Sequence, residues 1–485
     1  MPRVLTSLTA FAMAFAASPA PAEIPQDIAD EAAGLRTVAL AESDAYRIVH
    51  SLTTEVGPRL AGSEGDRAAV AWALTTLSDM GFDDVRAQTV IVPAWERGEA
   101  EVGITAPYPQ DLVAVALGHT VGTPEDGIEA PVLRVTSMEE LEALPAARVR
   151  GHIVFIDQRM ARARDGAGYN AIHRVRTAGP GEASRRGAVA TVIRSLGTSG
   201  DRFAHTGMTK FPEGVAPIPA FALSWPDADM LAHQVATDQE VMLRVRSTAR
   251  MLPDARSANV IAEIRGRDRP EEIVLLGAHM DSWDLGTGAI DDGAGVAIVT
   301  ETARLISTLP KKPSRTIRLV LFTNEEAGLS GAKAYAAAAA GSGENHVIGL
   351  EADLGPFRIW RFHSGVGPEG LPVVAGITEL LEPLGIAPGN NDSRGGADLS
   401  PMRDAGMPVL SLDHDASRYF DIHHTINDTL DKVDPEDLRQ SVAAYATITW
   451  VVANVPGGFG SYPDREKPAK PEPGAESNGK GTPKP

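Results

Sequence analysis

Three patterns of hydrophobic and polar positions follow one another along the chain. Residues 25 to about 95 carry helical patterning, clearest over 40–52 and 66–80. From about 100 to 247 the pattern changes to short apolar β-type runs that Gly and Pro separate. From about 255 to 455, strand-like apolar runs alternate with longer helical segments. This alternation predicts a parallel or mixed α/β sheet.

The third region contains four strand candidates, and the middle region contains two clear ones. In open α/β sheets, ligands bind just beyond the carboxyl ends of the strands. The residues that follow each strand are therefore the first place to look for chemistry. The candidates are 273–276, 316–322, 347–350 and 408–412 in the third region, and 151–156 and 188–193 in the middle region.

We predict an α/β fold with a mixed, mostly parallel sheet flanked by helices and interrupted by an inserted β-rich domain. The chain is long enough for about three units at ~150 residues each. The predicted boundaries are 1–22 for a signal peptide, 23–100 for the first part of the main domain, 101–250 for the insertion, 251–460 for the catalytic part and 461–485 for a disordered tail.

The first residues have the features of a cleavable export signal. Arg3 supplies a positive start, residues 5–17 form a weakly apolar run, and Ala20-Pro21-Ala22 is a small-x-small cleavage pattern. The apolar run is shorter than the ~20 residues that cross a bilayer. A membrane anchor or an N-terminal helix is the alternative. We therefore expect a periplasmic or secreted protein.

Composition and charge narrow the classes of function. The chain has 45 Lys and Arg against 64 Asp and Glu, a net charge of −19, which argues against nucleic acid or an anionic membrane surface as a partner. It contains no cysteine, so disulfides, thiolate catalysis and cysteine-type zinc sites are excluded. A hydrophobic content of 43% supports a substantial core.

Histidine and carboxylate residues follow the predicted strands or open the helix beside them. Each motif alone has an ordinary explanation, such as a surface pair, a solvated loop or a helix-dipole contact. Their joint occurrence at strand ends within one apolar region favours a metal site. The residues are His279 and Asp281, Asp291 and Asp292, Glu325 and Glu326, Asp353, and His423 and His424.

The residue types indicate which metal and which chemistry to expect. Imidazole and carboxylate without thiolate suit Zn²⁺, and less well Mn²⁺ or Co²⁺. Two cations ~3.5–4 Å apart need a bridging anion, and Asp291, at a Gly-flanked helix start, fits that requirement. Adjacent residues in an extended turn point in different directions. One residue of Glu325-Glu326 can therefore bind metal while the other acts as a general base on a water molecule.

The ordered motifs resemble the M28 family of di-zinc metallopeptidases, and the resemblance covers most of the chain. The DSWD-x-G and HH spellings, with residues 56–72 and 92–98, are most similar to its plasma glutamate carboxypeptidase branch. Residues 101–250 resemble a protease-associated domain, and the family has the zinc exopeptidase fold. The motifs are GAH-x-DSW at 277–283, GAIDDGAG at 288–295, NEEAG at 324–328, ExD at 351–353 and HHTxxDT at 423–429.

The resemblance implies two Zn²⁺ ions per chain with five protein ligands. His279 and Asp353 would bind one ion, Glu326 and His424 the other, and Asp291 would bridge both. All five positions carry the expected residue types.

The resemblance also assigns roles to residues around the ligands. Glu325 would be the general base, and Asp281 would orient His279. His423 stands where related carboxypeptidases have a tyrosine that stabilises the tetrahedral intermediate, and an imidazole can donate the same hydrogen bond.

The expected function is that of a zinc exopeptidase acting on dipeptides or short peptides, like a dipeptidase or carboxypeptidase. An aminopeptidase, a non-catalytic binding module on the same fold and a one-metal acyl-transfer enzyme such as a glutaminyl cyclase remain alternatives. The inserted domain is either a packing module or a lid that restricts substrates and helps form a homodimer. Within it, residues 203–214 are the segment most expected to contact substrate.

Overall fold

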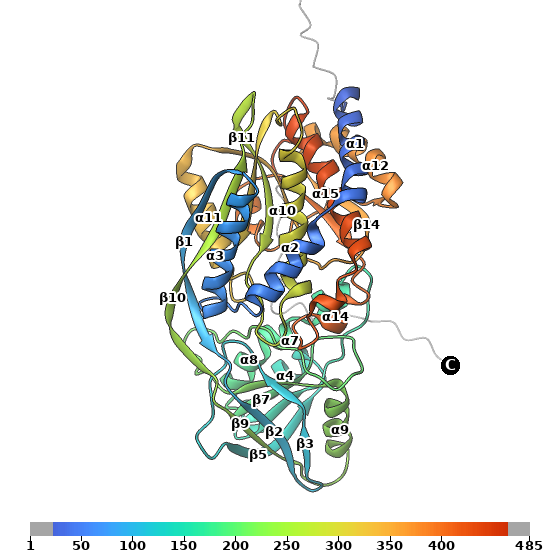
Figure 1. The fold of residues 1–485 in the computed structure, drawn as a ribbon. Coiled ribbons are helices and arrows are strands. Elements are labelled where there is room, and N and C mark those ends of the chain that lie inside the picture. Colours follow the sequence, from blue (N-terminus) through green and yellow to red (C-terminus); the bar gives the residue numbers. More distant parts are fainter. Residues whose placement is uncertain (1–22, 464–485) are drawn as a thin grey trace, which may run out of the picture.

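Two eight-stranded sheets form the framework of the protein. The computed structural model describes residues 23–463, so the predicted signal peptide (1–22) and residues 464–485 of the predicted tail lie outside it. Figure 1 shows the first sheet with most of the helices above the second sheet, with the long strands β1 (Asp83–Glu96) and β10 (Arg250–Ile264) running between them. Within residues 23–463, no helix has the length and apolar character needed to cross a membrane.

The first sheet is mixed, with four parallel strands at its centre. Every residue of β12 is buried, because helices cover both faces of a parallel sheet and its strands become continuous apolar runs. The four strands predicted in the third region are confirmed as β11, β12, β13 and β16. The spatial order is β1, β10, β12 (Arg315–Phe322), β11 (Arg269–His279), β13 (Asn345–Glu351), β16 (Val409–His414), β14 (Ile359–Gly365) and β15 (Ala387–Pro388).

Helices cover both faces of the first sheet. Val260 and Ala262 of β10 join the core on one face, whereas Ile261 between them joins the core on the other, as the period of two requires. The larger core includes α1 (Gln26–Glu42), α2 (Ala45–Ser51), α3 (Glu64–Asp79), α10 (Ala294–Ser307), α12 (Leu371–Leu381) and α15 (Pro435–Asn454). The smaller core includes α11 (Ser330–Ser342) and α13 (Ser400–Asp404).

The second sheet comes from the middle of the chain. Its strands β5 to β8 are parallel, and the remaining pairs are antiparallel. The helices α4 (Met138–Ala143) and α8 (Gly179–Arg185) lie on one face, and α9 (Trp225–Val235) lies on the other. The order is β3 (Gln110–Leu112), β2 (Ala100–Ala106), β9 (Met242–Ser247), β5 (Ile128–Val135), β6 (Ile153–Ile156), β7 (Ala190–Arg194), β8 (Ala220–Leu223) and β4 (Ala114–Ala116).

Two helical predictions near the N-terminus are wrong. Residues 83–96 form strand β1, in which Val90, Val92 and Ala94 are buried at alternate positions. Their period is therefore two and not 3.6. The predicted helix over 40–52 is broken at Ser43, whose backbone is extended, and α2 begins after it.

The two aspartates expected to open a helix lie before it. Asp291 and Asp292 have non-helical dihedral angles in the turn η2 (Ala289–Gly293), and the regular helix α10 begins at Ala294. The carboxylate of Asp428 accepts hydrogen bonds from the backbone nitrogens of Ile290 (2.6 Å) and Asp291 (3.3 Å). The Asp428 carboxylate therefore satisfies backbone N–H groups just before the helix. The turn keeps its non-helical conformation.

Candidate metal centre

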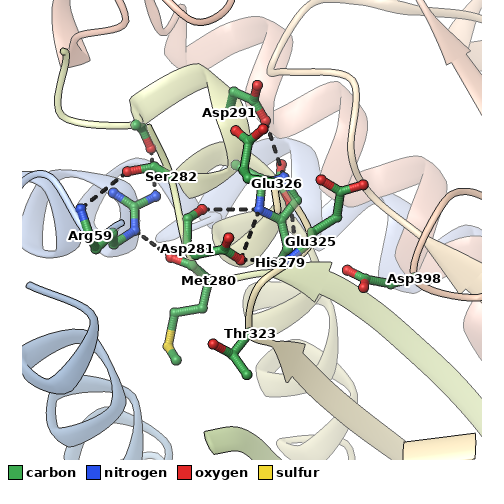
Figure 2. Close-up of polar contacts among 12 residues, drawn as sticks. Arg59, His279, Met280, Asp281, Ser282, Asp291, Thr323, Glu325, Glu326 and Asp398 are labelled. Atoms are coloured by element: carbon green, nitrogen blue, oxygen red, sulfur yellow. Dashed lines mark hydrogen bonds and ion pairs between the residues drawn. The ribbon is translucent and has the colours of Figure 1, made fainter. Parts of the chain in front are cut away.

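The predicted site residues meet at the carboxyl ends of the parallel strands. His279 ends β11, the two glutamates follow β12, and Asp353 follows β13. The two adjacent histidines follow α14 (Tyr419–Ile422), the short helix after β16. Figure 2 shows His279, Asp291 and Glu326 gathered in one place. Parallel strands bring their carboxyl ends to one edge of the sheet, so residues far apart in the sequence come together there.

Asp291 lies at the centre of this group. Its Oδ1 lies 3.1 Å from His279 Nε2, and its Oδ2 lies 3.2 Å from His424 Nε2. His279 Nε2 is also 3.5 Å from Asp353 Oδ1, and His424 Nε2 is 3.0 Å from Glu326 Oε2. The geometry therefore contains two imidazole–carboxylate pairs that share one aspartate.

The donor atoms fit a divalent cation. In the set His279, Asp291 and Glu326, one ligand atom from each residue lies within 4.8 Å of the others, and all three residues are buried. The Oε1 atom of Glu326 is buried without a hydrogen-bond partner among residues 23–463. Buried carboxylates need compensation, and imidazole with carboxylate oxygen is a donor set that zinc accepts. Two further sets, Asp291-His423-His424 and His279-Asp292-Asp353, meet the same spacing.

Burial raises the pKa values of the carboxylates in this group, whereas the nearby imidazoles lower them. Burial alone would raise the pKa of Asp291, but hydrogen bonds from His279 and His424 hold that pKa well below its usual value. Burial dominates at Glu325, Glu326 and Asp353, and it raises the pKa of each. The site therefore holds more carboxylate than its two paired imidazoles can balance, a surplus that a bound cation would neutralise.

Asp281 makes a different contact from the one expected. The backbone carbonyl of Asp281 accepts a hydrogen bond from His279 Nδ1 at 3.0 Å, whereas its carboxylate Oδ1 lies 3.7 Å from that atom. Oδ1 instead accepts a hydrogen bond from the backbone nitrogen of Glu325 at 3.0 Å. The residue thus fixes the His279 ring through its main chain and the Glu325 backbone through its side chain.

The two adjacent glutamates point in different directions, as expected. Glu326 Oε2 accepts a hydrogen bond from Trp283 Nε1 at 2.6 Å and faces His424. Figure 2 shows the Glu325 carboxylate to one side, apart from those of Asp291 and Glu326. Asn324, just before the pair, has a φ of 60°. This left-handed conformation is one that Asn tolerates better than most residues, and it turns the chain so that the two carboxylates separate.

His423 and His424 stack, with ring centroids 3.5 Å apart and an interplanar angle of 20°. His424 Nδ1 donates to the carbonyl of Thr206 at 3.2 Å, which leaves Nε2 directed at Asp291 and Glu326. His423 Nε2 lies 3.4 Å from Asp291 Oδ2. His423 is therefore close enough to Asp291 either to donate a hydrogen bond to a substrate or to bind a metal ion.

Arg59 and Asp428 hold the site, and sequence reasoning gave neither of them a role. Arg59 is fully buried and donates to the carbonyls of Met280 (2.5 Å), Thr287 (2.6 Å) and Gly288 (2.7 Å). It thereby ties the segment after β11 to the turn that carries Asp291, and Asp428 supports the same turn. Arg59 lies within the motif at 56–72 and Asp428 within the motif at 423–429. A charged residue in a motif, with no chemical role assigned to it, was the signal in the sequence that could have pointed to each of them.

Trp283 positions Glu326 and is itself held by the second sheet region. Gly118 lies so close to the Trp283 ring that a Cβ at position 118 would overlap it. Trp95 adds an edge-on contact with ring centroids 6.3 Å apart. The orientation of a proposed ligand therefore depends on a glycine in a distant part of the sequence.

A cavity of about 760 Å³ opens beside the cluster and is lined by both sheet regions. Asp291, Glu325, Glu326, Asp353 and both histidines reach it. Its volume lies in the range of small-molecule sites, ~300–1,000 Å³. The remaining lining includes Tyr169, Arg176, Met208 and Lys210 from the second sheet region, and Leu329, Lys333, Leu354, Arg394 and Arg403 from the first.

A mixed α/β sheet that gathers buried imidazoles and carboxylates at its strand ends is an arrangement in which metal-dependent enzymes can hold divalent cations. Residues 259–449 match the model of peptidase family M28. Human carboxypeptidase Q is 33% identical over 429 residues, which cover 88% of this chain and 89% of the human protein. The chain therefore belongs to peptidase family M28, and it is a peptidase.

Solved structures agree with this family. The peptidase M28 precursor from Shewanella amazonensis SB2B is 46% identical, covers 91% of this chain and 100% of its own, and superposes with a TM-score of 0.89. A zinc aminopeptidase from Bacillus subtilis is 20% identical, covers 84% of this chain and 95% of its own, and has a TM-score of 0.60. The latter shares the fold.

Proposed function

We propose that the protein is a zinc-dependent exopeptidase that hydrolyses dipeptides or short peptides. One observation carries the proposal: two imidazole–carboxylate pairs share Asp291 beside Glu325, in a cavity of about 760 Å³. The names of two similar proteins, carboxypeptidase Q and a zinc aminopeptidase, support it. The non-catalytic binding module is disfavoured because the chain belongs to a peptidase family.

The proposed ligand sets follow the two pairs. His279 and Asp353 would hold one Zn²⁺, Glu326 and His424 the other, and Asp291 would bridge them. When bound, the ions would polarise the scissile carbonyl and make a bound water molecule more acidic.

The side chains around the cluster would handle the protons. Glu325 is the general base that takes a proton from the attacking water and returns it to the leaving amine. Its backbone is held by Asp281, and no hydrogen bond within residues 23–463 engages its carboxylate, which leaves the carboxylate free for this task. His423 reaches the same cavity and donates a hydrogen bond to the oxyanion that forms.

The second sheet region would restrict the substrate to short peptides. Met208 and Lys210, within the predicted contact segment 203–214, line the cavity opposite the first sheet region. We propose that residues 101–250 are a protease-associated domain that acts as this lid. Export through residues 1–22 and formation of a homodimer belong to the same proposal.

A zinc-loaded preparation tests the function directly. We expect hydrolysis of unblocked dipeptides, its loss on chelation and its return with Zn²⁺, because the bound ions would polarise the scissile carbonyl and activate the attacking water. Glu325→Gln should lower kcat by about 100- to 10,000-fold, the range for removal of a general base, and keep the zinc content.

Glu379→Gln, on the exposed surface of α12, is the matched control and should behave like wild type. A Glu325→Gln variant that hydrolyses dipeptides at the wild-type rate would show that the base lies elsewhere. A zinc-loaded wild-type protein without hydrolytic activity on any dipeptide would refute the proposed substrate class.

A further inference from the structure

The main chain of His424 needs support from outside its own segment. Among the five proposed ligands, only His424 has a left-handed backbone conformation, with a φ of 61°. A residue with a Cβ is disfavoured in that conformation and keeps it where the surrounding structure holds it. His424 lies in a turn after α14, outside any helix or strand. The contacts that fix this ligand must therefore come from another part of the molecule.

Two consecutive residues of the second sheet region hold this turn. The Thr206 backbone nitrogen donates to the carbonyl of His424 at 3.0 Å, and the Thr206 carbonyl accepts a hydrogen bond from His424 Nδ1 at 3.2 Å. His205 Nδ1 donates to the carbonyl of His423 at 2.7 Å. Within residues 23–463, no other residue outside 419–429 is hydrogen-bonded to the main chain of either histidine in the turn. The second sheet region thus sets the position of a proposed ligand of the first.

The two supporting residues are themselves fixed in the second sheet region. His205 and Thr206 are 1% and 0% exposed. The backbone nitrogen of His205 donates to Ser195 Oγ at 2.9 Å, and that hydroxyl donates to the carbonyl of Leu223 in β8 at 2.6 Å. A Cβ on Gly197 would overlap the His205 ring, so glycine at this position leaves room for the ring. A movement of the second sheet region would therefore move the supports of the turn with it.

The ligands of the other proposed ion are held within the first sheet region. His279 ends β11, and its Nδ1 donates at 3.0 Å to a carbonyl two residues further along the same segment. Asp353 lies two residues after β13. Glu326, by contrast, accepts a hydrogen bond from Trp283, whose ring packs against the second sheet region. Glu326 and His424 therefore form the pair whose geometry depends on that region.

We propose that His205 and Thr206 are positioning residues for His424, so that the zinc ion on this ligand is bound fully only while the second sheet region is packed against the first. The inference rests on the proposed function and deepens it, because it makes the inserted region a part of the metal centre. The coupling is reciprocal: zinc held by His424 also stabilises the packed arrangement of the two regions. Residues that orient a metal ligand typically change metal affinity by about 10- to 100-fold.

Zinc binding at buffered concentrations of free Zn²⁺ tests this inference. Wild type should hold two ions per chain. His205→Leu should raise the free Zn²⁺ concentration that half-fills the weaker site by about 10- to 100-fold and leave the stronger site unchanged. The His205 ring has no second hydrogen bond to lose, because its Nε2 is buried without a partner among residues 23–463.

Three further variants separate the hydrogen bond from a general effect on the fold. His205→Asn keeps a side-chain N–H donor close to the position of Nδ1 and should restore most of the zinc affinity. Ser195→Ala removes the acceptor of the His205 backbone nitrogen and should weaken the same site. His233→Leu, at an exposed histidine on α9, is the matched control and should bind zinc like wild type.

The zinc titration also separates this inference from the proposed function. Equal zinc affinities in wild type and His205→Leu would overturn the inference. An equal loss at both sites, or no recovery in His205→Asn, would overturn it as well, because the ring would then act through the fold as a whole. Two zinc ions in a wild-type protein that hydrolyses no dipeptide would refute only the proposed function. Fewer than two ions in wild type would refute both.

Discussion

Some residues of the candidate metal centre could be predicted from the sequence, and others could not. His279, Glu326 and Asp353 could be predicted because each follows an apolar strand, and the fold brings strand ends together. Arg59 could not be given a role, because its partners are backbone carbonyls that leave no trace in residue identity. The carbonyl of Asp281, which orients His279, was hidden for the same reason.

The shared position of Asp291 leads to a prediction on metal content. Asp291→Ala removes both oxygens that lie between His279 and His424, so two cations would repel each other without a bridging anion. We expect elemental analysis to find less than half of the wild-type zinc in this variant. Glu325→Gln, which removes no proposed ligand, should match wild type. Full zinc occupancy in Asp291→Ala would rule out the bridge.

Among the elements, the buried strands were predictable and the exposed ones were not. Strands such as β12 are covered on both faces, so their continuous apolar runs identify them. Strand β1 lies at the edge of its sheet and pairs only with β10, so its mixed composition resembles that of an exposed helix. The break at Ser43 between α1 and α2 also escaped prediction, because it depends on tertiary contacts such as that of the Asp44 backbone nitrogen with Glu301 Oε1 at 2.8 Å.

Strand β16 carries a histidine that makes stability depend on pH. His414 is 1% exposed, its Nδ1 donates to the carbonyl of Phe357 at 2.8 Å, and burial lowers its pKa from 6.5 to about 4, although nearby Asp413 acts in the opposite direction. The neutral ring is favoured in the folded state, so the unfolded chain binds more protons between pH 6.5 and 4. Stability is therefore complete above pH 6.5 and falls as the pH drops toward 4.

We expect this histidine to cost about 2 kcal/mol of unfolding free energy between pH 7.5 and pH 5. Denaturant titrations at the two pH values measure the loss. His414→Gln keeps a donor for Phe357 but cannot titrate, so its loss should be smaller than that of wild type by that amount. An equal pH dependence in the two proteins would mean that the pKa of His414 does not differ between the folded and the unfolded state.

At the scale of the whole molecule, the two sheet regions are joined by specific polar contacts. Arg97 lies between them: its Nε is 2.9 Å from Asp284 Oδ1 and its Nη1 is 2.9 Å from Thr206 Oγ1. The guanidinium also lies 5.0 Å from the ring centroid of Trp95 and 5.7 Å from that of Trp283. One cation thus connects the second sheet region to the segment that carries the site.

Arg97→Met should destabilise the protein by about 1–3 kcal/mol, because it leaves a partly buried carboxylate unpaired. It should also lower peptidase activity, since Trp283 contacts both Arg97 and Glu326. Arg250→Met is the control: the Arg250–Glu96 pair is exposed at both ends and should contribute no more than ~1 kcal/mol. Equal unfolding midpoints for the two variants would show that Arg97 is not a joint between the regions.

The middle region leaves and rejoins the first sheet at one point, because Glu96 and Arg250 are paired neighbours on β1 and β10. A chain segment whose two ends are adjacent can be replaced or altered without disturbing the domain that it interrupts. The five proposed metal ligands and Glu325 lie outside the middle region, whereas Arg176 and Lys210, which line the cavity, lie within it. Substitutions confined to this one continuous stretch of sequence can therefore reshape the cavity and leave the proposed ligands unchanged.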